Sequence, residues 1–468
     1  MNKQKVSTYL IIFTIFFLTQ FKNLNIETLE WDISTYLVMG QDIVRGNLPY
    51  EFQWSVKPPL IYFIFGFFSF LSGGDYLIIK ILDKLVILFS SLFIYKIVER
   101  NNNYFAGLIS SLIYLVFMEN DYLGQVGYSE IYSSFFLLLA INYDHSEKNK
   151  KILIGLFLGL MTLVNTGSVV LFLSYLILNV KKSLKNFYMI GLGFSIPHLI
   201  FMFIYFLNGI LKSYLVSMIV MPLAYAGSNF EDESGFIKSF IDKVLLENIF
   251  LGFLIILLIF GILLSFRTQK KYINDLSLIL LIAGLIYPFL ANKGYVHHWI
   301  FFITILCLNI LNVKKISFFK LVFIMTLISF INISYDASFR SLNNLRNIDS
   351  LKDNYPVYQI SLILKNQVGI EESSILSLDG HLILFYLDKQ NLSYHVHPRN
   401  RIFDQFNEPL IKYDMLKENE IDYILSQKPE IIVCSEFSNL HFIDCESLKD
   451  YKLLEQDYIQ SIKVVYKN

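Results

Sequence analysis

Charged residues and cysteines are both scarce in this chain of 468 residues. Only 17% of the residues are Asp, Glu, Lys or Arg, and there are three cysteines. Three cysteines in so long a chain exclude a small scaffold held together by disulfides. An ordinary soluble domain has about 25% charged residues, so this chain has fewer charges than a water-exposed surface usually needs.

A surplus of positive charge is absent as well. The 39 basic residues balance the 39 acidic ones, and the net charge is zero. Proteins that bind nucleic acid need a basic surface, so we expect no nucleic-acid partner. Hydrophobic residues make up 54% of the chain, which excludes intrinsic disorder. The composition therefore predicts an all-α polytopic membrane protein surrounded by membrane lipids.

Apolar stretches recur along the first two thirds of the chain. A spanning helix needs roughly 20 mostly apolar residues, and shorter ones can span inside a bundle. About eleven transmembrane helices are predicted on this criterion. They lie near residues 6–22, 77–97, 104–119, 129–143, 151–165, 168–180, 187–208, 247–266, 274–291, 298–312 and 317–334.

The apolar stretch Leu60–Leu71 is left out of these spans because it is short and lies between Pro58-Pro59 and Gly73-Gly74. We expect it to form a helix along the membrane interface. Lys and Arg then gather in every second connection, whereas the short connections on the other side hold only Lys293. The positive-inside rule places the N-terminus in the cytoplasm and the C-terminus outside.

Two regions follow from this topology. A transmembrane domain is predicted over residues 1–335, with long outer loops at 23–76 and 209–246. Over 336–468 charges return and apolar runs shorten to strand length. The tail is therefore expected to be a small extracytoplasmic α/β domain.

Within the tail, local patterns predict two strands and two helices. The strands are expected at Ser373–Leu378 and Ile431–Val433, and the helices at Asn354–Val368 and Pro409–Glu418. Cys434 and Cys445 also lie in the tail and would pair in an oxidising compartment, although their spacing fits reduced thiols equally well. Cys307 falls within a span, where packing is expected.

The first long outer loop contains two candidate functional residues, Asp32 and Lys57. Asp32 closely follows the first span and precedes an amphipathic segment over 33–45. It is either a functional carboxylate or the N-cap of that helix, and the pattern alone favours the cap. Lys57 stands directly before Pro58-Pro59. It would either hold a lipid phosphate at headgroup depth or extend its ammonium to the water boundary.

Two further candidates lie in later outer connections. Glu130 begins a predicted span, where a carboxylate is costly unless it faces a wet cavity or a partner. His297 and His298 precede Trp299. Adjacent histidines point in different directions on a helix, so this pair alone does not predict a metal site, and an interfacial aromatic belt is the expected setting.

Taken together, these motifs resemble those of the GT-C glycosyltransferases, in the bacterial branch of aminoarabinose-lipid A transferases and protein O-mannosyltransferases. The resemblance covers about residues 5–335. It comprises Asp32, the turn Gly46-Asn47-Leu48-Pro49-Tyr50, Lys57-Pro58-Pro59-Leu60-Ile61-Tyr62, Glu130 and the late His-aromatic motif. The tail is similar to the small outer domain of such enzymes.

The resemblance implies an inverting enzyme that moves a sugar from a polyprenyl-phosphate donor to a hydroxyl of a lipid, glycan or protein acceptor at the outer membrane face. Asp32 matches the expected base, Glu130 the second acidic position and Lys57 the lysine expected to hold the donor phosphate. His297 or His298 matches the late His-aromatic position. Tyr225 lies in a segment that resembles the approach to the later outer loop, so it is a candidate for binding donor or acceptor.

Two departures from the family pattern keep other functions open. The family often has Glu after the first acidic residue and Glu before Lys-Pro-Pro, and here these positions hold Ile33 and Val56. In some members the second Glu helps to hold a divalent metal, so the cofactor is left unassigned. The alternatives are a catalytically inactive GT-C-like subunit and a transporter or flippase of lipid-linked glycans. A transporter predicts repeated halves, and no repeat is evident by eye.

Overall fold

The computed structural model describes most of the chain and divides it into two compact units. The described residues are 3–124, 127–144, 150–180, 183–227, 236–246, 249–265, 271–291, 295–309, 316–367, 373–435, 445, 448–454 and 462–467. Lys293 of the predicted outer connection lies outside them. Unit 1 comprises Met1–Asn23, Ile81–Phe201 and Asn229–Arg346, and unit 2 comprises Leu24–Lys80, Met202–Ser228 and Asn347–Asn468.

The described residues of unit 1 are mostly helical. Its helices are α1 (Lys3–Thr19), most of α4 (Tyr76–Asn101), α5 (Tyr104–Met118), α6 (Ser129–Asp144), α7 (Lys151–Val164), α8 (Val169–Val180), most of α9 (Leu184–Leu207), α12 (Phe236–Phe240), α13 (Ile249–Ser265), α14 (Lys271–Ala291), α15 (Ile300–Leu308) and α16 (Ile316–Arg346). The predicted last span, 317–334, lies within α16, which continues to Arg346.

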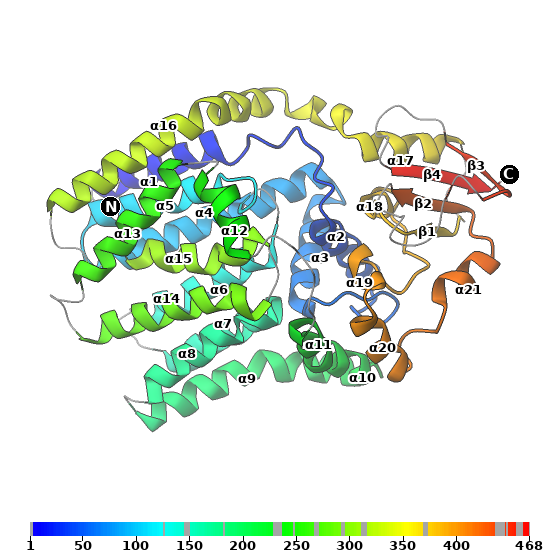
Figure 1. The fold of residues 1–468 in the computed structure, drawn as a ribbon, viewed down its shortest axis with the longest axis horizontal. Helices are drawn as coiled ribbons and strands as arrows, with labels where there is room; N and C mark the ends of the chain where they lie inside the picture. Colours follow the sequence, from blue (N-terminus) through cyan, green and yellow to red (C-terminus); the bar gives the residue numbers. More distant parts are fainter. Residues whose placement is uncertain are drawn as a thin grey trace. The chain divides into compact units, whose positions relative to one another are not determined.

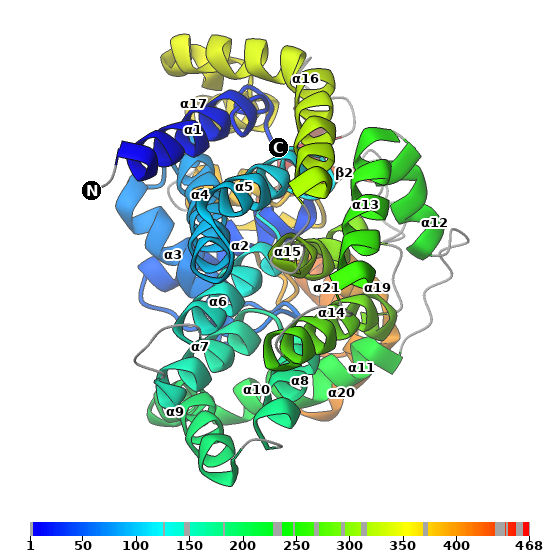
Figure 2. The same cartoon turned by 90° about the vertical axis from the view of Figure 1, so that its left-hand side faces the viewer.

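Two helices form the centre of unit 1. Helix α15 is buried at every residue and packs against α5, α6, α13 and α14. Helix α5 is buried from Ala106 to Met118. A helix that is apolar all round needs neighbours on every side. The helices α1 and α16 meet this need on one side of α5 and also pack against each other (Figures 1 and 2).

The helices α7 and α9 approach each other closely through glycines. A Cβ added at Gly155 would lie 2.1 Å from the backbone oxygen of Ile190, and one at Gly193 would lie 2.1 Å from that of Ile152. Only glycine fits such contacts without moving a backbone. Small residues of this kind let helices pack tightly inside a membrane.

Helix α9 presents an apolar surface to its surroundings. Among the described helices, it alone is both at least 18 residues long and apolar enough to cross a bilayer, while several other apolar helices are shorter. Leu192, Phe203 and Phe206 are among its exposed side chains. An exposed apolar face of this length is suited to lipid, which supports a membrane location. The number of spans stays a prediction.

Unit 2 combines two helices of the first predicted outer loop with a small α/β tail. Its elements are α2 (Trp31–Val44), α3 (Pro59–Ser72), α10 (Leu211–Leu215), α11 (Met221–Gly227), α17 (Pro356–Gln367), α18 (Leu382–Leu387), α19 (Pro398–Ile402), α20 (Asp404–Lys412), α21 (Glu420–Ser426), β1 (Ile375–Ser377), β2 (Ile431–Ser435), β3 (Tyr451–Leu453) and β4 (Ile462–Lys467). Helix α3 covers the predicted short helix and ends at Gly73 in the left-handed conformation.

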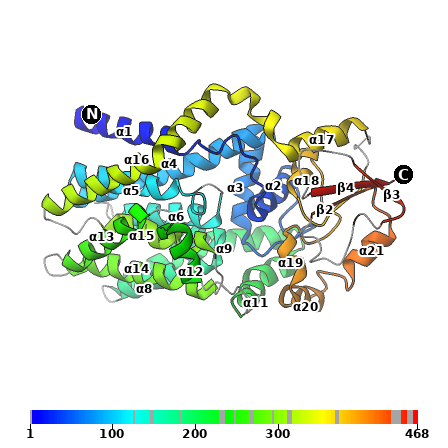
Figure 3. The same ribbon diagram turned by 45° about the horizontal axis from the view of Figure 1, so that its top comes forward.

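The tail forms a four-stranded sheet of order β1-β2-β4-β3 (Figure 1; Figure 3 shows β2, β4 and β3 from another side). The strands β1 and β2 are parallel, with Leu376 opposite Ile432, and β4 is antiparallel to both β2 and β3. Alternate side chains of β2 face the same way, so Ile432 and Cys434 share one face and pack with Ile424 of α21. Cys434 and Cys445, for which the sequence left the reduced and the paired state open, form a disulfide within this core.

One predicted helix of the tail has the wrong boundaries. The sequence pattern placed it at Pro409–Glu418, whereas α20 runs from Asp404 to Lys412 with Pro409 inside it. Asp404 lies in the first turn, where an acidic side chain is favourable. Asp414 then adopts a left-handed conformation, so the helix cannot continue to Glu418.

Candidate active site

The start of helix α2 differs from the predicted cap. The helix begins at Trp31, and its N-cap is Glu30 rather than Asp32. Glu30 Oε2 accepts hydrogen bonds from the backbone N–H groups of Asp32, at 2.7 Å, and Ile33, at 3.1 Å. Because Glu30 satisfies these two N–H groups, the Asp32 carboxylate is free of the capping role.

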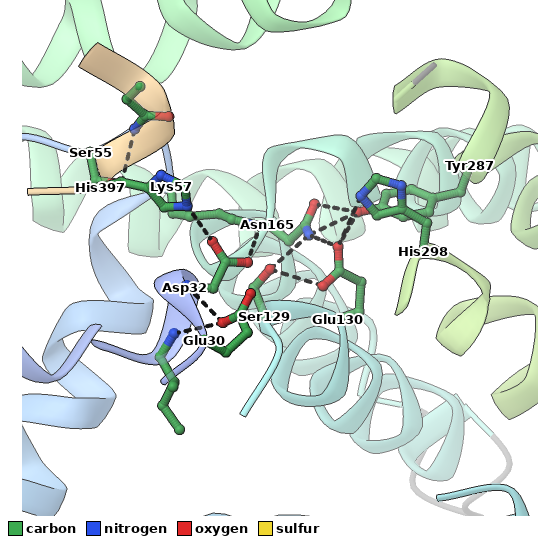
Figure 4. Close-up of polar contacts among 12 residues, drawn as sticks. Glu30, Asp32, Ser55, Lys57, Ser129, Glu130, Asn165, Tyr287, His298 and His397 are labelled. Carbon is green, nitrogen blue, oxygen red and sulfur yellow. Dashed lines mark hydrogen bonds and ion pairs between the residues drawn. The ribbon is translucent and has the colours of Figure 1, made fainter. Parts of the chain in front are cut away.

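Asp32 instead faces a lysine and a histidine of the same unit (Figure 4). Lys57 Nζ lies 3.5 Å from Asp32 Oδ2, and His397 Nε2 lies 3.3 Å from Asp32 Oδ1. The Asp32 side chain is 12% exposed and that of Lys57 is 18% exposed. The pair is thus shielded from bulk water without being sealed from it.

A second contact indicates which ring nitrogen of His397 carries the proton. Its Nδ1 accepts a hydrogen bond from the backbone N–H of Arg399 at 3.2 Å, which caps helix α19. An imidazole nitrogen that accepts a hydrogen bond carries no proton, so the proton of the neutral ring is on Nε2. The N–H of His397 therefore faces the Asp32 carboxylate and can orient it. Nothing in the sequence near Asp32 indicated this partner, because it belongs to the distant tail.

Lys57 is held by its main chain and by the crossing of α2 and α3. Tyr50 donates a hydrogen bond from its hydroxyl to the Lys57 carbonyl oxygen at 2.6 Å. Helix α3 begins two residues later at Pro59, which suits the first turn of a helix. A Cβ at Gly40 of α2 would lie 2.7 Å from the backbone nitrogen of Gly66 in α3. This close crossing fixes the start of α2, with Asp32, relative to Lys57.

The expected amphipathic helix over 33–45 is instead buried on all sides as far as Asp42, and only its last residues are exposed. Every residue of α2 from Asp32 to Asp42 is buried. The tail covers the polar positions: Gln41 donates to the Phe385 carbonyl oxygen at 2.9 Å, and Gln390 donates to Asp42 at 2.8 Å. The amphipathic prediction was wrong because the sequence of α2 alone does not show that another segment satisfies its polar face.

The carboxyl of Glu30 has an unusual proton affinity. Burial, together with the neighbouring Asp32 carboxylate, raises the pKa of Glu30 to about 8. Near neutral pH Glu30 then holds a proton, and Asp32 is the carboxylate that faces Lys57.

Glu130 lies at the start of α6 in unit 1 and is fully buried. Its Oε1 accepts hydrogen bonds from the Tyr287 hydroxyl, at 2.8 Å, and from Asn165 Nδ2, at 3.0 Å. Its Oε2 accepts from the Ser129 hydroxyl at 3.2 Å. These three neutral donors hold the carboxylate in one orientation (Figure 4). Asn165 and Tyr287 were not identified from the sequence, since each is a single polar residue in or beside an apolar stretch.

His297 and His298 gather around Glu130 in the same unit. They lie in a short 3₁₀ helix, Val296–Trp299, and both are buried. The ring of His297 stacks on Tyr128, with centroids 4.1 Å apart, and His298 Nε2 lies 3.9 Å from Glu130 Oε1. One ligand atom from each of Glu130, His297 and His298 lies within 4.8 Å of the others. The prediction that this pair alone forms no metal site stays a prediction, because the group that the structure brings together also includes Glu130.

The remaining predicted positions have simpler surroundings. Tyr225 belongs to α11 in unit 2, and its ring stacks on Phe406 of α20 with centroids 6.1 Å apart. Val56 offers no ligand atom, so the family's metal-holding glutamate has no counterpart at that position. The structure thus brings Asp32 and Lys57 together in unit 2, and Glu130, His297 and His298 together in unit 1.

No family model and no curated protein matches the chain. The same fold is found in ArnT from Cupriavidus metallidurans bound to undecaprenyl phosphate, with a TM-score of 0.65 and 12% identity over 98% of this chain and 97% of that chain. The apo oligosaccharyltransferase of Archaeoglobus fulgidus gives a TM-score of 0.58 and 11% identity over 92% of this chain and 69% of that chain.

The Archaeoglobus fulgidus oligosaccharyltransferase AglB, in complex with an inhibitory peptide and a dolichol-phosphate, is similar over 93% of this chain and 69% of that chain, with a TM-score of 0.54 and 9% identity. At identities this low, the TM-scores establish that the chain shares the fold of these proteins, and no more than the fold. Together with the motifs of the first outer loop, these matches confirm the resemblance of the sequence: the chain has the GT-C fold of these glycosyltransferases.

Proposed function

We propose that the chain is a membrane glycosyltransferase that moves a sugar from a polyprenyl phosphate to a hydroxyl group of a cell-envelope acceptor. The acceptor is a lipopolysaccharide, a glycan or a protein at the outer face of the cytoplasmic membrane. The observation that carries the proposal is the arrangement of Asp32 between Lys57 Nζ, at 3.5 Å, and His397 Nε2, at 3.3 Å.

Asp32 supplies the base in this reaction. An acceptor hydroxyl is a weak nucleophile until its proton is removed as the new bond forms. Asp32 is partly shielded from water, and His397 orients its carboxylate through one oxygen. The acceptor oxygen attacks the anomeric carbon while Asp32 takes the proton.

Lys57 stabilises the leaving group. The bond that breaks joins the anomeric carbon to a phosphate oxygen, so the lipid phosphate leaves with added negative charge. A lysine ammonium acts on it as a compact point charge. The bound undecaprenyl phosphate of ArnT and the dolichol-phosphate of AglB support a polyprenyl phosphate as the donor. Attack from the face opposite the phosphate inverts the anomeric configuration.

Four other residues keep the roles that the sequence indicated. Glu130 is proposed as the second catalytic carboxylate. His297, His298 and Tyr225 are proposed to contact donor or acceptor. These assignments rest on the family positions that they match.

The test uses membranes that contain the full chain and radiolabelled polyprenyl-phosphate sugars. We expect transfer of label to an envelope component, and we expect Asp32→Asn to lower its rate by about 10²–10⁴-fold, the usual contribution of a general base. Asp450→Asn is the matched control, because Asp450 is an exposed acid paired with Lys428. It should leave the rate unchanged.

Two results would contradict the proposal. Full transfer by Asp32→Asn would exclude this residue as the base. Label that crosses the bilayer on its lipid without transfer, equally in both variants, would instead indicate a flippase.

A further inference from the structure

We propose that the indole ring of Trp31 stacks against a sugar ring at the Asp32 site and that Asp379 holds the indole in place. The inference rests on the proposed transferase function and adds a contact to the same site. Trp31 Nε1 donates a hydrogen bond to Asp379 Oδ1 at 2.9 Å. The indole also makes an edge-to-face contact with the ring of His397, with centroids 6.0 Å apart. All four residues belong to unit 2.

Trp31 is more exposed than the two other tryptophans of the chain. Trp54 is fully buried and Trp299 is 6% exposed, whereas Trp31 is partly exposed. The N–H of its indole is already bonded to Asp379, so the ring offers a ligand only apolar surface. A pyranose has C–H groups on one face, and these groups pack against the electron-rich face of an aromatic ring.

The position of Trp31 suits a sugar that reacts at Asp32. Trp31 directly precedes Asp32 at the start of α2, and His397 contacts the side chains of both residues. In the proposed reaction the donor sugar is attached to the phosphate held by Lys57, and the acceptor hydroxyl meets Asp32. The indole is therefore within reach of the donor sugar and of a sugar-bearing acceptor, and either one presents the same pyranose chemistry.

Asp379 holds the indole before any substrate binds. Its side chain is buried, and its Oδ1 also accepts a hydrogen bond from the backbone N–H of Gly380 at 2.6 Å. A hydrogen bond from Trp31 to a carboxylate is stronger than one between neutral groups. The indole is thus held in one orientation, and a ring that is fixed in advance loses less entropy when a sugar binds.

A buried arginine braces the two segments of the tail that contact Trp31. Arg401 donates a hydrogen bond to the carbonyl oxygen of Leu378, the residue before Asp379, at 3.4 Å. It also donates to the carbonyl oxygen of His395, two residues before His397, at 3.1 Å. The segments that carry Asp379 and His397 are therefore tied to one guanidinium.

The experiment measures how each substrate saturates the enzyme. Membranes that contain the full chain receive a radiolabelled polyprenyl-phosphate hexose as donor and an extract of cell-envelope glycans as acceptor, and each is varied with the other in excess. We expect Trp31→Leu to raise the half-saturating concentration of one of them about tenfold, with a smaller change in kcat. A rise for the donor assigns the ring to the donor sugar, and a rise for the extract assigns it to an acceptor sugar.

Matched variants separate stacking from packing. Trp31→Phe keeps an aromatic face and should recover most of the affinity lost in Trp31→Leu. Tyr423→Leu is the control, because Tyr423 is a 48% exposed aromatic residue of α21 in the same unit and contacts Lys417 instead. It should leave both half-saturating concentrations unchanged.

Asp379 is tested as a positioning residue. Asp379→Ala removes the acceptor of the indole N–H, so it should raise the same half-saturating concentration by about three- to tenfold. Asp379→Asn should restore it, because the amide oxygen accepts the same hydrogen bond. Adding Asp379→Ala to Trp31→Leu should cause no further rise, since Asp379 acts through the indole.

Three results would overturn the inference. The first is transfer by folded Trp31→Leu with both half-saturating concentrations unchanged; where Trp31→Leu does not fold, an unchanged Asp379→Ala has the same meaning. The second is an equal rise in Trp31→Leu and Trp31→Phe, which would assign Trp31 a packing role. The third is a further rise in the double variant. Wild-type membranes that transfer no sugar would instead remove the proposed function, and this inference with it.

Discussion

At the scale of single residues, Glu30 both caps a helix and retains a proton. Its carboxyl accepts two backbone hydrogen bonds at the start of α2, while burial and Asp32 raise its pKa to about 8. The unfolded chain releases this proton near the ordinary value of 4.5. Between these two values the folded state holds one more proton than the unfolded state, so folding stability falls as pH rises.

Glu30→Gln should remove this pH dependence. The amide still offers an oxygen to the two N–H groups but cannot ionise. From pH 5 to pH 8 we expect the free energy of unfolding of wild-type protein in detergent to fall relative to that of the variant, by a few kcal/mol at most. The melting temperature should fall with it. Parallel stability curves for the two proteins across this range would contradict the assignment of the proton to Glu30.

His397 acts at the same scale as a positioning residue. In His397→Asn the new side chain can still cap α19, because Asn is a good N-cap, but it has no ring N–H to orient Asp32. We expect kcat to fall about 10–100-fold with KM for the donor and melting temperature nearly unchanged. A rise in KM alone, or a loss of fold, would assign His397 a binding or structural role instead.

The sequence predicted the central pair of residues but not their partners. Asp32 and Lys57 were identified because both belong to a recognisable loop pattern, and the structure places them 3.5 Å apart. His397 could not be found, since it is distant in sequence and no local pattern marks it. Glu130 was identified from the cost of a carboxylate at membrane depth, whereas its contacts with Asn165 and Tyr287 depend on helix packing.

At the scale of elements, the crossing of α2 and α3 determines the geometry of the Asp32–Lys57 pair. Gly40 and Gly66 bring the two backbones into contact. The same sequence patterns that gave both helices did not indicate this crossing or the burial of α2. Helix existence follows from local apolar runs, but burial depends on which other segment packs against the helix.

Gly40→Val should therefore reduce both stability and activity. The added side chain would overlap the backbone of α3, and overpacking of this kind costs about 1–3 kcal/mol. We expect a lower melting temperature and a loss of transfer larger than the loss of folded protein. Gly191→Ala on α9 is the control, because a Cβ there meets nothing within 4 Å, so its melting temperature should not fall.

At the scale of the whole molecule, composition predicted the class, and local patterns predicted most of the tail. The predicted strands at Ser373–Leu378 and Ile431–Val433 contain β1 and β2. The tail was expected to be a separate domain, whereas it shares one compact unit with 24–80 and 202–228. Contacts such as the Gln41 hydrogen bond to Phe385 unite them, and such long-range pairing is not visible in one sequence.

The membrane topology gives a test at this scale. With the N-terminus in the cytoplasm and the tail outside, a C-terminal alkaline phosphatase fusion should be active and a C-terminal green fluorescent protein fusion should be dark. The Cys434–Cys445 disulfide fits an oxidising compartment. A fluorescent C-terminal fusion in intact cells would reverse the predicted orientation.

The distant origin of His397 has a consequence for how the protein matures. Asp32 emerges early from the ribosome, whereas its histidine partner follows more than three quarters of the chain later. A nascent chain that contains only its first helices therefore still lacks the histidine proposed to orient its base. Under the proposed roles, the base can be oriented for the reaction only after His397 has been synthesised and has folded against Asp32.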